Sequence, residues 1–234
     1  MSGTGTGVGK TVVTAAIAAL ARERGGDVAV VKPAQTGVLA GQSGDLDEIA
    51  RLSGVTDLHE LARFPAALSP EAAARVSGLP PADLRLAARQ VAKLTADGKL
   101  VLIEGAGGVA VRYDHSGTTV ADLASALGAP VLVVTCAGLG TLNHTALTLM
   151  ALSARGLECA GVVVGNWPAE PDIAARCNLA DLRILAGRPL CGALRANAGS
   201  LDPKRFLRAA RACLGPALGG EFDPAEFESR HGWR

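Results

Sequence analysis

The chain has 234 residues, of which 49% are hydrophobic, so it can bury one substantial core and we expect one domain. Its 23 basic and 22 acidic side chains nearly cancel to a formal net charge of +1, which excludes the basic excess typical of nucleic-acid-binding proteins. Aromatic residues make up only 3% of the chain, which argues against stacking platforms for single-stranded nucleic acid.

The chain has five cysteines, and no two of them form a Cys-x-x-Cys pair. We interpret them as reduced, mostly buried thiols in a cytosolic protein, not as metal ligands or disulfides. The apolar runs are too short, or too often interrupted by glycine and polar residues, to span a membrane, and we recognise no signal peptide. We therefore expect a cytoplasmic protein that has neither a membrane nor a nucleic acid as partner.

The first eleven residues form a glycine-rich segment that ends in Gly9-Lys10-Thr11. Glycines allow a backbone loop to direct several N–H groups at one ligand, and the helix that follows adds its positive end, so such a segment is typical of a phosphate loop. Lys10 would reach the outer phosphates of a nucleotide, and the Thr11 hydroxyl would bind magnesium. A flexible tail is the alternative, but the apolar helical pattern over residues 12–20 makes it the weaker interpretation.

This loop departs from the general motif in two ways. Thr4 stands where the motif has a glycine, and Gly3 lies one residue further out. Only Met1 and Ser2 precede the loop, although a phosphate loop normally follows a buried strand. We therefore expect that this strand is missing from the chain and that the natural protein has a longer N-terminus.

Apolar runs and helical patterns alternate along the rest of the chain. Short β-branched runs predict buried strands at residues 28–31, 100–103, 130–134, 159–164 and 190–194. Helical patterns lie at residues 10–25, 45–54, 83–97, 119–128, 143–156, 172–187 and 204–214. This alternation predicts an α/β fold: a doubly wound, mostly parallel sheet with helices on both faces, as in phosphate-loop NTP hydrolases. We expect one domain over residues 1–215 and a poorly ordered tail over 216–234.

Ligands of such sheets bind beyond the carboxyl ends of the strands, so the residues after each strand are candidates for the site. Glu104 follows one strand and, as a buried carboxylate, needs a cation or strong donors; a salt bridge or turn cap is the alternative to a metal. Asp45 begins a helix, where it could bind metal or act as a cap. Lys32 follows another strand and could orient an anionic substrate group or extend to solvent.

Four ordered motifs together resemble one family. They are the phosphate loop, Lys32-Pro-Ala-Gln-Thr36-Gly, Glu104-Gly-Ala-Gly-Gly and Gly140-Thr-Leu-Asn143-His144. This combination resembles dethiobiotin synthase, the penultimate enzyme of biotin synthesis, from residue 3 to about residue 195. In that family the extra residue in the phosphate loop is normal.

The resemblance implies an ATP-dependent cyclo-ligase. Such enzymes convert 7,8-diaminononanoate, CO2 and ATP into dethiobiotin, ADP and phosphate, through a carbamate and a carbamic-phosphoric anhydride, with Mg2+ as cofactor. The family is homodimeric, and its active sites lie at the subunit interface. Phosphoryl transfer depends mainly on positioning and charge neutralisation, which two lysines and a magnesium ion can supply.

The resemblance also implies a role for individual residues. The phosphates would be bound by Thr6, Gly7, Val8, Gly9, Lys10 and Thr11, and the nucleotide base by Asn166. Magnesium would be held by Thr11, Asp45 and Glu104. The substrate would contact Lys32, Thr36, Ala106, Gly107 and Gly108, and would also meet Leu139, Gly140, Thr141 and Asn143 of the partner subunit. Lys10 and Lys32 would be catalytic. Arg195 stands where the family often has a proline near the base.

Three alternatives remain at this point. An amide synthase acting on a corrinoid-like acid would need a glutaminase domain, and the chain after residue 195 is too short to hold one. A partition-type ATPase switch would have a second lysine early in the phosphate loop, where this chain has Gly5. An inactive or weakly stable relative would follow from loss of the first strand, which is central in the expected fold.

Overall fold

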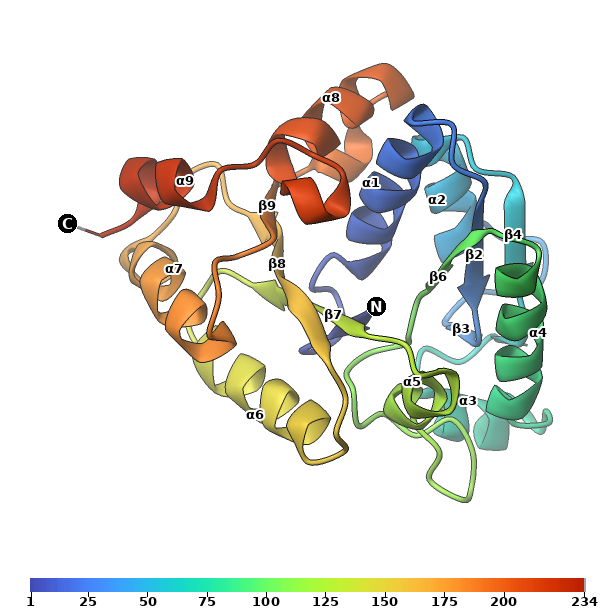
Figure 1. Ribbon diagram of the computed structural model, residues 1–234. Coiled ribbons are helices and arrows are strands. Elements are labelled where there is room, and N and C mark those ends of the chain that lie inside the picture. The colour runs from blue at the N-terminus through green and yellow to red at the C-terminus, as the bar shows by residue number, and fades with distance from the viewer. Residues whose placement is uncertain (234) are drawn as a thin grey trace.

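The computed structural model describes residues 1–233 and has parallel strands between two layers of helices (Figure 1). One group of strands runs in the order β4 (Asp57–Glu60), β2 (Val28–Lys32) and β6 (Leu100–Ile103). A second runs in the order β1 (Ser2–Gly3), β7 (Val131–Cys136), β8 (Cys159–Trp167) and β9 (Gly192–Arg195). A small pair, β3 (Gln35–Thr36) with β5 (Arg63–Phe64), lies apart.

Residues 1–3 join the two larger groups of strands. On one side Ser2 and Gly3 pair with Val133 and Val134 of β7. On the other side the Met1 amino group donates to the Ile103 carbonyl at 2.7 Å, and the Gly105 N–H donates to the Met1 carbonyl at 3.0 Å. The prediction that the strand before the phosphate loop is missing was therefore wrong. A two-residue strand takes its place because backbone hydrogen bonds on both sides, not a run of apolar side chains, hold it in the sheet.

Helices cover both faces of the sheet, as predicted for a doubly wound fold. One face carries α1 (Lys10–Glu23), α2 (Asp45–Ser53) and α8 (Pro203–Cys213). The other carries α4 (Leu84–Ala96), α5 (Val120–Leu127), α6 (Thr141–Ser153) and α7 (Ile173–Ala186). The apolar strand residues divide between these two cores. In residues 1–233, every helix is too short or too polar to cross a bilayer.

The sequence did not predict several short elements around the pocket. These are the strands β3, β4 and β5 and the helix α3 (Pro70–Ser77). The β4 segment reads Asp-Leu-His-Glu and pairs only with β2, so it is a polar edge strand without the apolar run that identifies a buried one. The last strand also begins two residues later than predicted, at Gly192.

The C-terminal segment, predicted to be poorly ordered over residues 216–234, contains two short helical elements, and residue 234 lies outside the described residues. A 3-10 turn at Pro216–Leu218 leads to α9 (Pro224–His231), which Asp223 caps by accepting from the Ala225 N–H at 2.8 Å. The Phe227 ring lies 5.1 Å from the Trp167 ring at the end of β8. Phe227 also contacts Phe222 of the same segment. The segment therefore packs against the end of β8 through aromatic contacts with Trp167.

Candidate active site

A pocket of about 630 Å³ lies at the carboxyl ends of the strands, where the sequence predicted the site. The predicted residues that line it are Thr6, Gly7, Gly9, Lys10, Thr11, Lys32, Thr36, Asp45, Glu104, Ala106 and Gly107. These residues come from the phosphate loop, the end of β2, β3, the loop after β6 and the start of α2. The fold thus brings most of the predicted site into one cavity.

The phosphate loop is held tightly against β8. Gly9 has φ 97° and precedes the first residue of α1, a conformation that favours glycine. A Cβ atom on Gly9 would lie 2.5 Å from the Gly165 carbonyl oxygen, and one on Gly165 would lie 2.1 Å from the Val8 carbonyl oxygen. Both glycines are therefore required, since any side chain would push the loop away from the strand.

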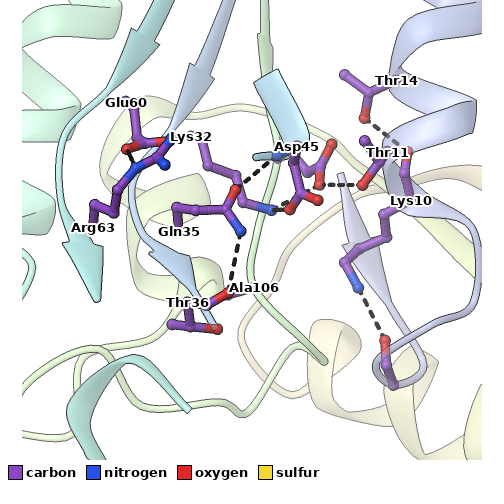
Figure 2. A network of polar contacts seen from close by, with 12 residues as sticks. Lys10, Thr11, Thr14, Lys32, Gln35, Thr36, Asp45, Glu60, Arg63 and Ala106 are labelled. Carbon is purple, nitrogen blue, oxygen red and sulfur yellow. Dashed lines mark hydrogen bonds and ion pairs between the residues drawn. The ribbon is translucent and has the colours of Figure 1, made fainter. Parts of the chain in front are cut away.

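Lys10 folds back over the loop, as Figure 2 shows, and its Nζ donates to the Gly5 carbonyl at 3.0 Å. The side chain is buried, and burial together with the nearby charge of Lys32 lowers the pKa of Lys10 below its ordinary value. An anion bound in the loop would oppose both effects. A phosphate bound in the loop would therefore favour the charged form of Lys10.

The second lysine, Lys32, lies between two carboxylates (Figure 2). Its Nζ donates to Asp45 Oδ2 at 2.5 Å and to Glu104 Oε1 at 2.7 Å. Burial would lower the pKa of Lys32, but the charges of Glu104 and Asp45 raise it above its ordinary value. Lys32 therefore does not extend to solvent, and its ammonium group stays charged inside the site.

The two carboxylate oxygens of Glu104 differ in their hydrogen bonding. Oε1 accepts from the Thr11 hydroxyl at 2.9 Å as well as from Lys32. Oε2 is buried and has no hydrogen-bond partner among residues 1–233, which is costly for a carboxylate oxygen. A divalent cation bound by Thr11, Asp45 and Glu104 would satisfy this oxygen, and all three are oxygen donors of the kind that hard cations prefer. The residues present therefore fit a metal.

The alternative role of Asp45 as a helix cap is not what the structure shows. The carboxylate of Asp47, two residues on, accepts from the Gly44 N–H at 2.7 Å at the start of α2. The Asp45 N–H donates to Gln35 Oε1 at 2.9 Å, which leaves the Asp45 carboxylate to face Lys32. Gln35, which the sequence analysis did not single out, thus positions the start of α2 at the pocket.

Other parts of the pocket were also missed. The Ala106 N–H donates to the Tyr113 hydroxyl oxygen at 2.6 Å, and burial raises the pKa of this fully buried tyrosine. The pocket is also lined by Leu68, Ser69, Pro70 and Val111. Ser69-Pro70 is a sequence signal for a helix start, a serine followed by a proline at the first helical position, and could have revealed α3.

Some predicted residues lie outside this pocket. Val8 has its side chain in the core, and Gly108 pairs with Gly3 beside the loop. Asn166 lines a separate groove of about 280 Å³ that shares Gly7 with the main pocket. This groove continues from the phosphate loop along the end of β8.

The predicted partner-facing segment, residues 139–143, does not line this chain's own main pocket. Leu139 is 93% exposed and Asn143 is exposed at the start of α6. Thr141 differs, because its side chain is buried and its hydroxyl donates to the Cys136 carbonyl at 2.7 Å. Thr141 therefore shapes the turn before α6, and its hydroxyl is not directed at solvent.

Comparison with known proteins identifies the family. A family model described as an AAA domain matches residues 1–200. ATP-dependent dethiobiotin synthetase BioD of Parafrankia sp. (strain EAN1pec) is 62% identical over 231 residues, covering 99% of this chain and 97% of that protein. The chain belongs to the ATP-dependent dethiobiotin synthetase family. The BioD protein of Streptomyces coelicolor is 54% identical over 232 residues, a match that covers 99% of this chain and 98% of that protein. The predicted family is thereby confirmed.

Solved structures support the fold of this family member. The septum site-determining protein MinD of Pyrococcus horikoshii, complexed with Mg-ADP, has a TM-score of 0.56 at 19% identity and covers 90% of this chain and 92% of that chain. A chain of the MinC:MinD cell division protein complex of Aquifex aeolicus has a TM-score of 0.58 at 16% identity and covers 95% of this chain and 96% of that chain. At these identities the likeness shows a phosphate-loop NTPase fold alone.

Proposed function

We propose that the protein is an ATP-dependent cyclo-ligase that forms dethiobiotin from 7,8-diaminononanoate and CO2. The observation that carries the proposal is the group of Lys32, Glu104, Asp45 and Thr11 beside the phosphate loop. The chain that holds this group is 62% identical to an ATP-dependent dethiobiotin synthetase. The group combines two acidic metal ligands with a buried cation that can face an anionic reactant. The products besides dethiobiotin are ADP and phosphate.

The reaction has three steps. One amine of the substrate adds to CO2 and loses a proton, which gives a carbamate. A carbamate oxygen then attacks the γ-phosphorus of ATP, and ADP leaves. The second amine attacks the carbonyl carbon of this anhydride, loses a proton and releases phosphate, which closes the ring. Negative charge is present in each step, so buried cations lower the barrier by electrostatic stabilisation.

The two lysines divide this task by position. Lys10 lies over the phosphate loop, where it would neutralise the outer phosphates. Lys32 lies at the end of β2 beside Thr36, on the side of the pocket where Ala106 and Gly107 would support the diamine. Because its pKa is raised, Lys32 stays protonated. Its ammonium group would orient the carbamate while a carbamate oxygen attacks the γ-phosphorus of ATP. Gly108 would support the substrate through its backbone.

Magnesium fits the cation site described above. Thr11, Asp45 and Glu104 would hold it directly or through water, and the ion would supply charge neutralisation between the phosphate groups. The Glu104 oxygen that has no partner in residues 1–233 supports this assignment. Thr6 to Thr11, with Val8 contributing only its backbone, would bind the phosphates, and Asn166 in the adjacent groove would contact the base.

A homodimer would complete the substrate site. On α6, Leu147 and Met150 are 55% and 65% exposed and, three residues apart, lie on one face of the helix. An uncovered apolar helix face of this kind supports pairing with a second copy of the chain. The exposed residues Leu139 and Asn143, with Gly140 and the turn shaped by Thr141, would then reach the partner's diamine.

The decisive experiment measures dethiobiotin formed from diaminononanoate, bicarbonate, Mg2+ and ATP. Lys32→Ala should abolish turnover but retain much nucleotide binding, whereas Lys10→Ala should lose nucleotide affinity. Lys204→Ala, at an exposed position on α8, is the matched control and should behave as wild type. Absence of dethiobiotin while a family enzyme is active in the same assay would reject the proposal, and slow ATP hydrolysis alone would favour an ATPase switch. Equal loss of nucleotide affinity in both variants would reject the division of roles.

A further inference from the structure

Four threonine hydroxyls meet between the phosphate loop, β7 and α6. Thr135, near the end of β7, lies at their centre: its Oγ1 is 2.7 Å from that of Thr141, 2.8 Å from that of Thr145 and 3.3 Å from that of Thr4. Thr135 and Thr145 are fully buried, and Thr141 is 3% exposed. The proposed reaction uses none of these hydroxyls, so the cluster requires another explanation.

The direction of every hydrogen bond in the cluster can be worked out. A hydroxyl has one proton to donate and two lone pairs to accept. Thr141 donates its proton to the Cys136 carbonyl, so the proton between Thr135 and Thr141 must come from Thr135. Thr145 and Thr4 must then both donate to Thr135. The single proton and both lone pairs of Thr135 are therefore occupied, and no other arrangement satisfies all four hydroxyls.

The cluster fixes the turn that leads to α6. Within residues 136–140, the Thr141 hydroxyl holds the Cys136 carbonyl, and buried Asn178 of α7 donates to the carbonyls of Ala137 and Gly138 at 2.7 and 3.0 Å. The next residue, Leu139, is the exposed tip. The three carbonyls that precede this tip, those of residues 136–138, therefore all accept side-chain hydrogen bonds.

The cluster also fixes the phosphate loop. Thr4 is attached to β7 twice, because its N–H donates to the Val134 carbonyl at 2.9 Å and its hydroxyl donates to Thr135. Thr4 lies two residues before Thr6, the first of the residues proposed to bind phosphate. If Thr4 moves, the buried Thr135 hydroxyl oxygen loses the hydrogen bond that it accepts from Thr4. Leaving a polar group unpaired in a buried cluster is costly.

We propose that Thr135 is a positioning residue that holds the segment 139–143 in a fixed relation to the phosphate loop. This inference rests on the proposed function, in which the phosphate loop of a subunit binds the nucleotide in its own active site. The segment 139–143 of that subunit contacts the diamine in the active site of the partner. Thr135 then links the two active sites of a dimer: nucleotide in one subunit's loop favours diamine binding in the other subunit's site. No other residue among 1–233 makes side-chain hydrogen bonds to both the phosphate loop region and the start of α6.

Thr135→Val tests the link, because it keeps the shape of the side chain and removes only the hydroxyl. We expect the KM of the diamine to rise about tenfold, the size predicted for loss of the one hydrogen bond that ties the loop to this cluster, between Thr4 and Thr135, with kcat changed less than about threefold. The diamine should also bind wild type more tightly when a non-hydrolysable ATP analogue is present, and the variant should lose most of this enhancement. Thr135→Ser should restore both properties.

Thr148→Val is the matched control. Thr148 is a buried threonine on α6, the helix that carries Thr141 and Thr145, but its hydroxyl donates only to the His144 carbonyl one turn earlier. The inference is overturned if Thr135→Val and Thr148→Val have equal diamine KM values, or if the analogue does not enhance diamine binding to wild type. If Thr135→Val folds poorly, Thr4→Val removes the same bond from the less buried end and should give the same rise in diamine KM. A wild-type protein that forms no dethiobiotin rejects the proposed function, which is a separate outcome.

Discussion

Lys32→Met should strongly destabilise the protein in the absence of nucleotide and metal. The substitution keeps most of the volume of the side chain but removes the charge that Glu104 and Asp45 share. Glu104 is fully buried, so its carboxylate would be left without a cation, whereas Asp45 is 35% exposed and is partly stabilised by water. The effect should therefore arise mainly from Glu104.

The expected magnitude follows from this burial. Removing one partner of a buried ion pair costs about 3 to 5 kcal/mol. For a chain of this size, each kcal/mol corresponds to roughly 2 to 4 °C, so the melting temperature should fall by roughly 6 to 20 °C. Thermal and urea unfolding, followed by circular dichroism in EDTA, would measure the change.

Two further variants separate a buried charge effect from general damage. Lys204→Met removes an exposed lysine and should change the melting temperature by less than about 2 °C, since exposed substitutions usually cost within 0.5 kcal/mol. Adding Glu104→Gln to Lys32→Met removes the unpaired charge and should recover part of the lost stability. If Lys32→Met is no less stable than Lys204→Met, or if the double variant is less stable than Lys32→Met, the reasoning is refuted.

Three further outcomes are expected. Glu104→Gln should weaken Mg2+ binding at least tenfold in calorimetry with ATP, because the amide keeps the shape but loses the charge; unchanged Mg2+ affinity would exclude Glu104 as a ligand. Because the pKa of Lys10 is lowered, kcat/KM for ATP should begin to fall with rising pH below the ordinary lysine pKa of about 10.4, and Lys10→Arg should lack this fall. Phe227→Ala should cost about 2 to 3 kcal/mol, less than a fully buried phenylalanine because Phe227 is half-buried, and should make the C-terminal segment sensitive to protease. If the variant resists protease as well as wild type does, the packing of Phe227 on Trp167 is unimportant.

The sequence predicted those parts of the molecule that short-range chemistry determines. Lys32 and Glu104 lie at the ends of apolar strands and the phosphate loop leads into a helix, so each could be placed from its neighbours in the sequence. The pairing of Lys32 with Glu104 could not be predicted, because 72 residues separate them and only the register of β2 on β6 brings them together. A single sequence carries no direct signal for that register.

The elements that escaped prediction have polar or very short sequences. β1 is held by backbone hydrogen bonds to neighbours on both sides, which involve no particular side chain. The C-terminal α9 has no strong amphipathic pattern, and its order depends on Phe227 meeting Trp167, a contact 60 residues apart. Gln35 and Tyr113 act on the backbone of the site residues, so their roles appear only in three dimensions.

The pairing of charges inside the pocket also determines how a nucleotide is attracted to it. Lys10 and Lys32 balance Asp45 and Glu104, so these four side chains together contribute no net charge. Long-range attraction from the pocket is therefore weak, and affinity for a triphosphate must come from short-range contacts with backbone N–H groups and a bound cation. Nucleotide affinity should accordingly depend little on ionic strength but strongly on divalent metal, so free ATP and its metal complex are different ligands for this site.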